Sequence, residues 1–244
     1  MAFDVGDQVY VARSLLGIDG NDVSPFYRTT VRARNNRSVR VDLPGGAQSG
    51  AIATSKVTAN FGVLIVRIGD FNEGGLLDPL AKSVLHYSRM LLPGDSVRLI
   101  ELRTEGELTT FWREIHGMCQ QVIIVGHGAP DGYLFGSANI TPQRLGEIFD
   151  APNPTKKEFI SLGCQTGYKA FGQPFSQTRC VSHFLAPFHS VHGCVASLFT
   201  QTFLNERLLA SRSTRVAFKH ARSDLKGAAS FRLWENGKLT AGPV

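Results

Sequence analysis

The sequence has few of the features that mark disulfide-stabilised, zinc-binding or membrane proteins. Four cysteines in 244 residues are too few for a disulfide framework, and none belongs to a C-x-x-C pair. No apolar run approaches the roughly 18 residues that a membrane span needs. The N-terminus, MAFDVGDQVY, lacks the basic-then-apolar segment of a secretory signal. We therefore expect a cytoplasmic protein that has no membrane partner, no metal and no cofactor.

The composition is that of an ordinary globular protein with an uneven charge. Hydrophobic residues make up 43% and charged residues 19%, which is enough to bury a sizeable core. The net charge of +6 comes mainly from residues 200–244, which hold eight basic and three acidic residues. This basic C-terminal segment predicts a solvated helix face or, alternatively, a surface for nucleic acid or another acidic partner.

Residues 1–60 have the pattern of a small all-β domain. The stretches DQVYVA, FYRTTVRA, SVRVDL and AIATSKV alternate or are rich in β-branched residues, as strands are. Asn35-Asn36 is expected to form a hairpin turn, because Asn tolerates positive φ. Four or five short strands in so few residues predict a closed barrel. The pattern resembles SH3-like or Tudor-like barrels, which implies an accessory domain.

Residues 61–244 have the pattern of an α/β domain with an open, mostly parallel sheet and helices on both faces. Continuous apolar runs alternate with segments of helical period, and such strands are buried on both sides. Strands are expected at 61–68, 96–102, 121–125, 159–162 and 191–199. Helices are expected at 78–92, where Asp78-Pro79 is the start signal, at 107–118, from Thr141-Pro142 to 149, around 176–185 and at 202–210.

Two of these strands end in residues that can carry out chemistry. The strand at 121–125 runs into His127-Gly128, and the strand at 159–162 runs into Cys164. Ligand sites of parallel sheets form at the carboxyl ends of the strands, and neighbouring strands lie about 5 Å apart. A histidine and a cysteine at the ends of adjacent strands can therefore face one crevice.

An imidazole beside a thiol is a nucleophilic pair. The imidazole assists removal of the thiol proton, the thiolate attacks a carbonyl, and an acyl-enzyme forms. The developing oxyanion needs preorganised donors. The backbone N–H groups of Gly128 and Cys164 are the candidates, because both lie where the chain turns out of the sheet. The sequence thus predicts a catalytic dyad of Cys164 and His127.

The two motifs together resemble those of caspase-like cysteine peptidases. Caspases carry Gln-Ala-Cys-x-Gly about 50 residues after the histidine, whereas Ser161-Leu162-Gly163-Cys164-Gln165-Thr166-Gly167 places the cysteine 37 residues after His127. The closer resemblance, over about residues 61–235, is to bacterial CHAT domains, whose cysteine strand commonly reads S-A-C-x-T-G. A later strand of these domains resembles GCVASLF, and an A-x-x-x-A-R-like stretch that follows a helix resembles Ala217–Arg222. The resemblance implies a caspase-like endopeptidase that cleaves proteins, is switched by a regulatory protein or ligand, and acts in bacterial defence or regulated cell death.

Secondary sites and rival functions follow from the remaining residues. Asp70 and Asp131 follow strand ends and are candidates for the pocket that selects a substrate side chain. Tyr168–Arg179 is either a mobile substrate loop or an ordinary surface loop, and Cys119, Cys180 and Cys194 are expected to be structural. The rival functions are a catalytically silent caspase-fold module that binds a protein or nucleic acid, and a hydrolase of small molecules. The last is disfavoured because the G-x-C-x-G elbow is incomplete.

Overall fold

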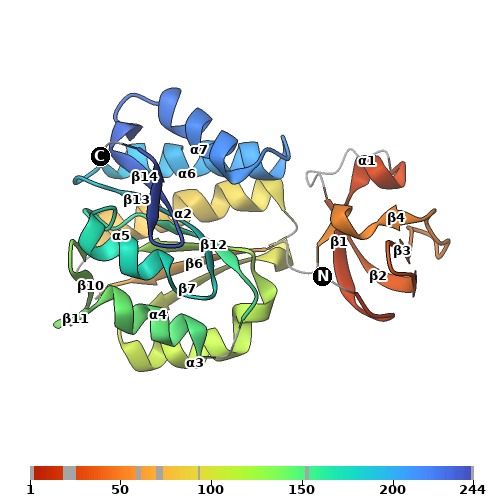
Figure 1. Ribbon diagram of the computed structural model, residues 1–244, viewed down its shortest axis with the longest axis horizontal. Coiled ribbons are helices and arrows are strands. Elements are labelled where there is room, and N and C mark those ends of the chain that lie inside the picture. The colour runs from red at the N-terminus through yellow and green to blue at the C-terminus, as the bar shows by residue number, and fades with distance from the viewer. Residues whose placement is uncertain are drawn as a thin grey trace.

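Two β-sheets organise the chain, a small one formed before residue 60 and a large one formed after it (Figure 1). The computed structural model describes residues 3–18, 26–58, 62–69, 74–92, 94–151 and 154–242. In Figure 1 the small sheet lies on the right, and the large sheet lies on the left between two layers of helices. The change from antiparallel to parallel strands falls between residues 58 and 63, where the sequence pattern changes.

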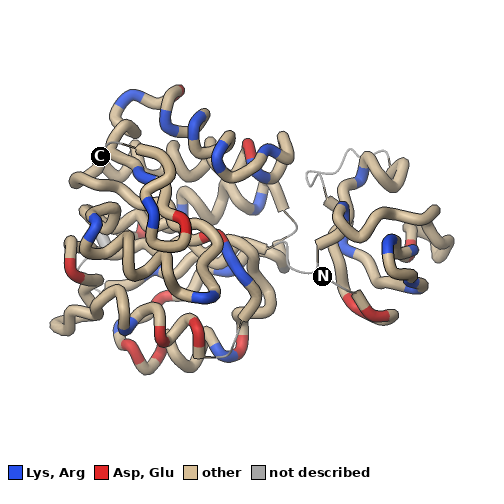
Figure 2. The backbone as a smooth tube through the Cα atoms, viewed as in Figure 1, with Lys and Arg blue, Asp and Glu red and all other residues tan. Residues whose placement is uncertain are grey.

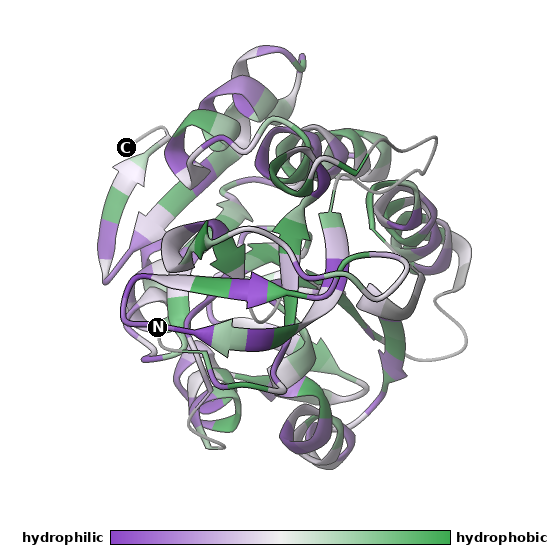
Figure 3. Cartoon of the chain, turned by 90° about the vertical axis from the view of Figure 1, so that its right-hand side faces the viewer, coloured by the Kyte–Doolittle hydropathy of each residue, from purple (hydrophilic) through white to green (hydrophobic). Residues whose placement is uncertain are grey.

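The N-terminal sheet is antiparallel, with strand order β4-β3-β2-β1-β5. Alternate residues such as Val9 and Val11 point into a core of its own, because successive side chains of a strand face opposite sides. Figure 3, which views the molecule from this side, shows the resulting alternation of hydrophilic and hydrophobic residues. Among the described residues the end strands β4 and β5 do not pair with each other, so the pairing is that of an open sheet. The elements are β1 (Gln8–Ala12), α1 (Arg13–Leu16), β2 (Phe26–Arg34), β3 (Ser38–Val41), β4 (Ile52–Ala53), η1 (Thr54–Lys56) and β5 (Val57–Thr58).

The hairpin turn expected at Asn35-Asn36 connects β2 to β3, but its physical basis differs from the expectation. The side-chain oxygen of Asn35 accepts hydrogen bonds from the backbone N–H groups of Arg37 and Ser38, at 2.8 and 2.7 Å. Neither asparagine has a positive φ. The turn is therefore stabilised by a side chain that replaces backbone acceptors, and not by left-handed backbone.

The C-terminal sheet has seven strands in the order β15-β14-β13-β12-β8-β6-β7. The five strands from β13 to β7 are parallel, and β14 and β15 are antiparallel additions at one edge. Every residue of β6, β8 and β12 is buried, as expected for the middle of a sheet that is covered on both faces. The strands are β6 (Val63–Ile68), β7 (Val97–Leu102), β8 (Gln121–Val125), β12 (Lys157–Ser161), β13 (Val181–Pro187), β14 (Phe231–Glu235) and β15 (Lys238–Ala241).

Helices cover the two faces of this sheet in two groups of three. One face packs against α2 (Gly74–Leu91), α6 (Gly193–Leu208) and α7 (Thr214–Ser223) through one apolar cluster. The other packs against α3 (Glu105–Ile115), α4 (Pro142–Asp150) and α5 (Lys169–Ser176) through a second cluster rich in phenylalanine. Figure 1 shows the two groups above and below the sheet. None of the helices described is long and apolar enough to cross a membrane.

Three expected elements differ from the structure. The segment 191–199 is not a strand but the first half of α6, because its buried residues Ala196, Phe199 and Phe203 recur at three- and four-residue spacing. The expected helix at 176–185 is instead the end of α5 followed by β13, and 202–210 continues α6. Short apolar runs do not separate strand from helix by periodicity alone.

The start of α2 also differs, since the helix begins at Gly74 and Pro79 lies in its second turn. Asp78 is therefore not a cap and pairs with Lys82 one turn later, at 2.8 Å. By contrast, Thr141 caps α4 and Pro142 is its first residue, as the sequence predicted.

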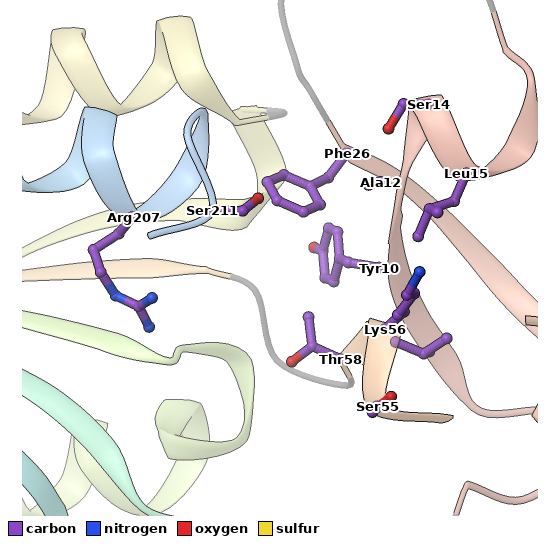
Figure 4. A pocket seen from close by; sticks show the side chains of 11 residues that line it. Tyr10, Ala12, Ser14, Leu15, Phe26, Ser55, Lys56, Thr58, Arg207 and Ser211 are labelled. Atoms are coloured by element: carbon purple, nitrogen blue, oxygen red, sulfur yellow. The ribbon is translucent and has the colours of Figure 1, made fainter. Parts of the chain in front are cut away.

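The N-terminal sheet contacts the amino edge of the large sheet. The hydroxyl of Tyr10 lies 2.5 Å from that of Ser96, just before β7, and Thr58 donates to the side chain of Gln120, just before β8, at 3.4 Å. A cavity of about 460 Å³ lies beside this contact. Figure 4 shows Tyr10 and Phe26 projecting into it. Its lining residues are Tyr10, Ala12, Ser14, Leu15, Phe26, Ser55, Lys56, Val57, Thr58, Arg207 and Ser211.

The basic C-terminal segment is partly neutralised within the fold. Figure 2 shows Lys and Arg residues along α7. Arg215 pairs with Glu235, and Arg207 pairs with the buried carboxylate of Glu158 at 2.8 Å. Lys219 remains exposed. Part of the positive charge of residues 200–244 is therefore paired with carboxylates within the fold.

Candidate active site

Strand register places His127 and Cys164 at the same level of the large sheet. β8 and β12 are parallel neighbours, and Ile124 pairs with Ser161. His127 follows the first of these residues by three positions and Cys164 follows the second by three. Beyond the last paired residues, the N–H of Leu162 still donates to the carbonyl of Ile124 at 2.8 Å. The two turns therefore leave the carboxyl edge side by side, as the sequence predicted.

The backbones of the two turns touch, and glycine makes this contact possible. A methyl group on Gly128 would lie 2.9 Å from the carbonyl oxygen of Cys164 and 3.1 Å from the carbonyl carbon of Gly163. On Gly163 it would lie 2.7 Å from the ring of Tyr133. Real Cβ atoms do not approach so closely, so any larger residue at either position would push the turns apart.

Cys164 sits in a tight turn that follows β12. The residue is half-buried and forms no hydrogen bond with the described residues. Gln165, which follows it, has a φ of 62°, in the left-handed region that non-glycine residues rarely adopt. The N–H of Tyr168 then donates to the carbonyl of Gln165 at 3.1 Å. Backbone strain of this kind is concentrated at functional sites. The imidazole of His127 is exposed.

A cluster of three buried hydroxyls, Tyr133, Ser161 and Thr166, supports this turn from beneath. The hydroxyls of Tyr133 and Ser161 are hydrogen-bonded, and that of Ser161 lies 2.5 Å from that of Thr166. Thr166 donates to the carbonyl of Gly163 at 2.8 Å, and the N–H of Gly163 donates to Ser161 at 3.2 Å. Burial raises the pKa of Tyr133 above its usual range, so its hydroxyl keeps its proton.

The far end of the cysteine turn is anchored to β13 and β14. The N–H of Gly167 donates to the carbonyl of Pro187 at 2.8 Å, and its carbonyl accepts from Arg232 at 3.1 Å and from Trp234 at 3.2 Å. The guanidinium of Arg232 lies 3.5 Å above the ring of Phe188. Burial lowers the pKa of Arg232. The turn that carries the cysteine is thus fixed on both sides.

Of the two secondary candidates, the structure describes Asp131 alone. Asp131 lies in the turn between β9 (Gly128–Ala129) and β10 (Gly132–Phe135), exposed, on the hairpin that follows His127. Asp70 lies outside the described residues. The segment 168–179 is not a loop throughout, because α5 occupies most of it and buries two phenylalanines.

The remaining thiols fall into two kinds. Cys119 and Cys180 are buried, and burial raises the pKa of both, that of Cys119 to about 11. Cys194, expected to be structural, is instead exposed in the first turn of α6, with its sulfur 3.1 Å from Nδ1 of His192. Among the described residues no three His, Cys, Asp or Glu side chains are grouped as metal ligands would be.

Sequence reasoning missed the hydroxyl cluster and the Arg232 anchor. Ser161 and Thr166 flank the cysteine in the motif. Two hydroxyl residues so close to the end of an apolar strand could have indicated a hydrogen-bonded cluster beneath the turn. Tyr133 and Arg232 gave none, because their positions depend on how the hairpin and β14 fold back on the sheet.

The fold is similar to that of a solved cysteine protease. No protein-family model and no curated protein matches the sequence. A structure of "iotapain", a secreted C11 cysteine protease from Bacteroides thetaiotaomicron, aligns with a TM-score of 0.51 and 8% identity, over 72% of this chain and 67% of that one. A structure of a secreted C11 cysteine protease from the same organism, in complex with an irreversible peptide inhibitor, aligns with a TM-score of 0.49 and 8% identity, over 72% and 66%. The chain therefore spans about two thirds of their length, and at this identity the likeness concerns the fold: a large, mainly parallel sheet between helices.

Proposed function

We propose that this protein is a cysteine endopeptidase of the caspase-like type, closest to CHAT domains, with Cys164 as nucleophile and His127 as general base. The observation that carries the proposal is the common register of the two residues on adjacent parallel strands, with their turns in backbone contact. The C11 protease fold supports the same conclusion. Free cysteines are usually buried and inert, whereas this one is only half-buried and precedes a residue in the left-handed region.

The proposed reaction uses groups that the two turns bring together. His127 removes the thiol proton of Cys164, and the thiolate attacks the carbonyl carbon of the scissile peptide. The N–H groups of Gly128 and Cys164 donate to the oxyanion. The C–N bond then breaks, His127 protonates the leaving amine, and an acyl-enzyme remains. Water adds to this thioester, loses a proton to His127, and releases the acid and the thiol.

Substrate selection is the part of the proposal that involves Asp131. It is the single carboxylate on the hairpin that follows His127 and it is exposed. A carboxylate at the rim of a cleft attracts cations, so we expect a preference for a basic side chain near the scissile bond. Asp70 follows the neighbouring strand and is proposed for the same role.

We also propose that residues 1–60 form an SH3- or Tudor-like accessory domain and residues 61–244 the peptidase domain. A cytoplasmic peptidase is hazardous unless regulated, so a protein or ligand that binds the accessory domain would switch it. A role in bacterial defence or regulated cell death belongs to this proposal. The separate core of the N-terminal sheet supports the division.

The test is cleavage of a peptide library together with labelling by a peptide-based electrophile. Wild type is expected to cleave and to be labelled at Cys164, while Cys164→Ala and His127→Ala lose cleavage by at least about a thousandfold. The double variant should lose no more than either single variant, because the two residues act as one unit. Cys194→Ala is the matched control, since it removes an exposed thiol that also contacts an imidazole. Wild-type cleavage by either single variant would refute the assignment.

A further inference from the structure

Tyr133 joins the hairpin that follows His127 to the strand and turn that carry Cys164. Its side chain is completely buried, yet its hydroxyl is directed to a polar spot beneath the cysteine turn and not to solvent. Buried hydroxyls cost free energy unless they are hydrogen-bonded. A phenylalanine would fill the aromatic cluster with Phe171 and Phe175 equally well, so the oxygen needs its own explanation.

The hydroxyl cluster closes the turn on both sides of the nucleophile. Thr166 follows Cys164 and donates to the carbonyl of Gly163, which precedes it. Ser161 accepts from the N–H of Gly163 and contacts Thr166. The two residues between these contacts, Cys164 and Gln165, are therefore held in a narrow arch, which explains why Gln165 adopts the left-handed conformation.

Tyr133 links this arch to His127. In the hairpin, Tyr133 pairs with Gly128, and the N–H of the next residue, Leu134, donates to the carbonyl of His127 at 3.0 Å. The same tyrosine hydroxyl binds Ser161 under the arch. One residue therefore connects the backbone that carries the imidazole to the backbone that carries the thiol.

We infer that Tyr133, acting through Ser161 and Thr166, is a positioning residue that sets the separation of the Cys164 and His127 turns. The inference rests on the proposed function. It does not place Tyr133 in contact with substrate. Loss of its oxygen would let the two turns shift by fractions of an ångström, and displacements of this size slow reactions that depend on oriented groups.

The test compares two tyrosine-to-phenylalanine variants in the full chain. Tyr133→Phe removes the oxygen from the site, and Tyr10→Phe removes the oxygen of a matched buried tyrosine–serine pair at the opposite edge of the sheet. Both are expected to lower the melting temperature by a few degrees. Tyr133→Phe alone should lower kcat for peptide cleavage about 10- to 100-fold, with KM changed less than about twofold. Unchanged kcat in Tyr133→Phe, or equal losses in both variants, would overturn the inference.

A second readout separates this inference from the proposed function. The rate of alkylation of Cys164 by iodoacetamide, followed from pH 5 to 9 by mass spectrometry, requires no peptidase activity. Tyr133→Phe is expected to lower the rate at pH 7 about fivefold or more, whereas Tyr10→Phe leaves it unchanged. If wild type cleaves no peptide but this difference appears, the positioning role stands and the peptidase assignment fails.

Ser161→Ala guards against the case in which Tyr133→Phe does not fold. It interrupts the same hydroxyl cluster with a smaller change, so it should reproduce the loss of kcat and of alkylation rate. Combined with Tyr133→Phe, its effect should be far less than additive, because both break one chain of contacts. Fully additive losses would show that the two residues act separately, which contradicts the inference.

Discussion

The two edges of the large sheet carry different kinds of surface. At the carboxyl edge, glycine backbones approach closely, Cys164 is half-buried and His127 is exposed. At the amino edge, the N-terminal sheet contacts Ser96 and Gln120. Each edge has a buried tyrosine–serine pair, but one joins two sheets and the other joins two turns of a single candidate site. The contact with the N-terminal sheet and the candidate site are thus separated by the length of the strands.

The largest expected difference between the edges is in thiol reactivity. Cys119 and Cys180 lie just before β8 and β13, at the amino edge, whereas Cys164 and Cys194 follow β12 and β13 at the other. With a pKa of about 11, Cys119 is thiolate in only about one molecule in ten thousand at pH 7, compared with a few per cent for a free thiol. Iodoacetamide at pH 7 should therefore label the carboxyl-edge pair at least about a hundredfold faster, as ranked by mass spectrometry.

The sequence predicted Cys164 as the nucleophile and the other three cysteines as structural, which would make Cys164 the first thiol to react. Cys194 now competes, because it is exposed and contacts His192. Labelling in urea should bring the four rates together, which serves as the control. Rapid labelling of Cys119 or Cys180 in the folded protein would contradict the burial on which this contrast rests.

The next largest effect is expected from adding one methyl group at the contact of the two turns. Gly128→Ala would place a carbon 2.6 Å from a methyl of Thr166 and 2.9 Å from the backbone of Cys164, so the turns must separate. We expect peptide cleavage to fall about 100-fold, since a misplacement near 1 Å has that effect. Gly50→Ala, which meets nothing within 4 Å, is the control and should stay within about twofold. If Gly128→Ala cleaved peptide at the wild-type rate, the backbone N–H of this residue could not be an oxyanion donor that depends on a fixed geometry.

Removal of the N-terminal sheet should have a smaller effect on the chemistry than on stability. Tyr10 and Phe26 pack into the large apolar cluster, so a 61–244 fragment loses this burial and should melt several degrees lower. Alkylation of Cys164 should stay within about twofold of the full chain, because the hydrogen bonds that hold the cysteine turn come from residues of the large sheet and its connections. A folded fragment with an unreactive Cys164 would show instead that residues 1–60 complete the site.

The sequence was informative where periodicity and strand ends decide the structure. β6 and β8 are mostly apolar, and β12 holds the apolar pair Phe159 and Ile160, so the adjacency of His127 and Cys164 could be predicted. The burial of Lys157 and Glu158 at the start of β12 could not. The segment 191–199 could not, because GCVASLF is apolar at both helical and strand spacing and only its packing as α6 decides. The β14–β15 hairpin also escaped prediction. It brings Arg232 and Trp234 to Gly167 from 65 and 67 residues away, a contact that no local pattern encodes.

The smallest expected effect concerns a charged cluster near the amino edge that should affect stability and leave the thiol unchanged. Glu235, at the end of β14, binds Arg215 and lies 2.6 Å from Nε2 of His183. The hydrogen bond from Arg215 holds the pKa of Glu235 below its usual range, and the charge of His183 adds to this. Because the pKa of Glu235 is lower in the folded state, the stabilisation is present above the unfolded pKa, about 4.3, and is lost as the pH falls through the folded pKa.

Glu235→Gln should therefore melt about 2–4 °C below wild type at pH 7, and this difference in melting temperature should close on acidification toward pH 3. Glu147→Gln, which removes an exposed pair with Arg144, should show a smaller difference. If the difference in melting temperature widened in acid, the ionised carboxylate of Glu235 would not be the source of the stabilisation. If Glu235→Gln changed the rate of Cys164 alkylation at pH 7, the two edges of the sheet would be coupled.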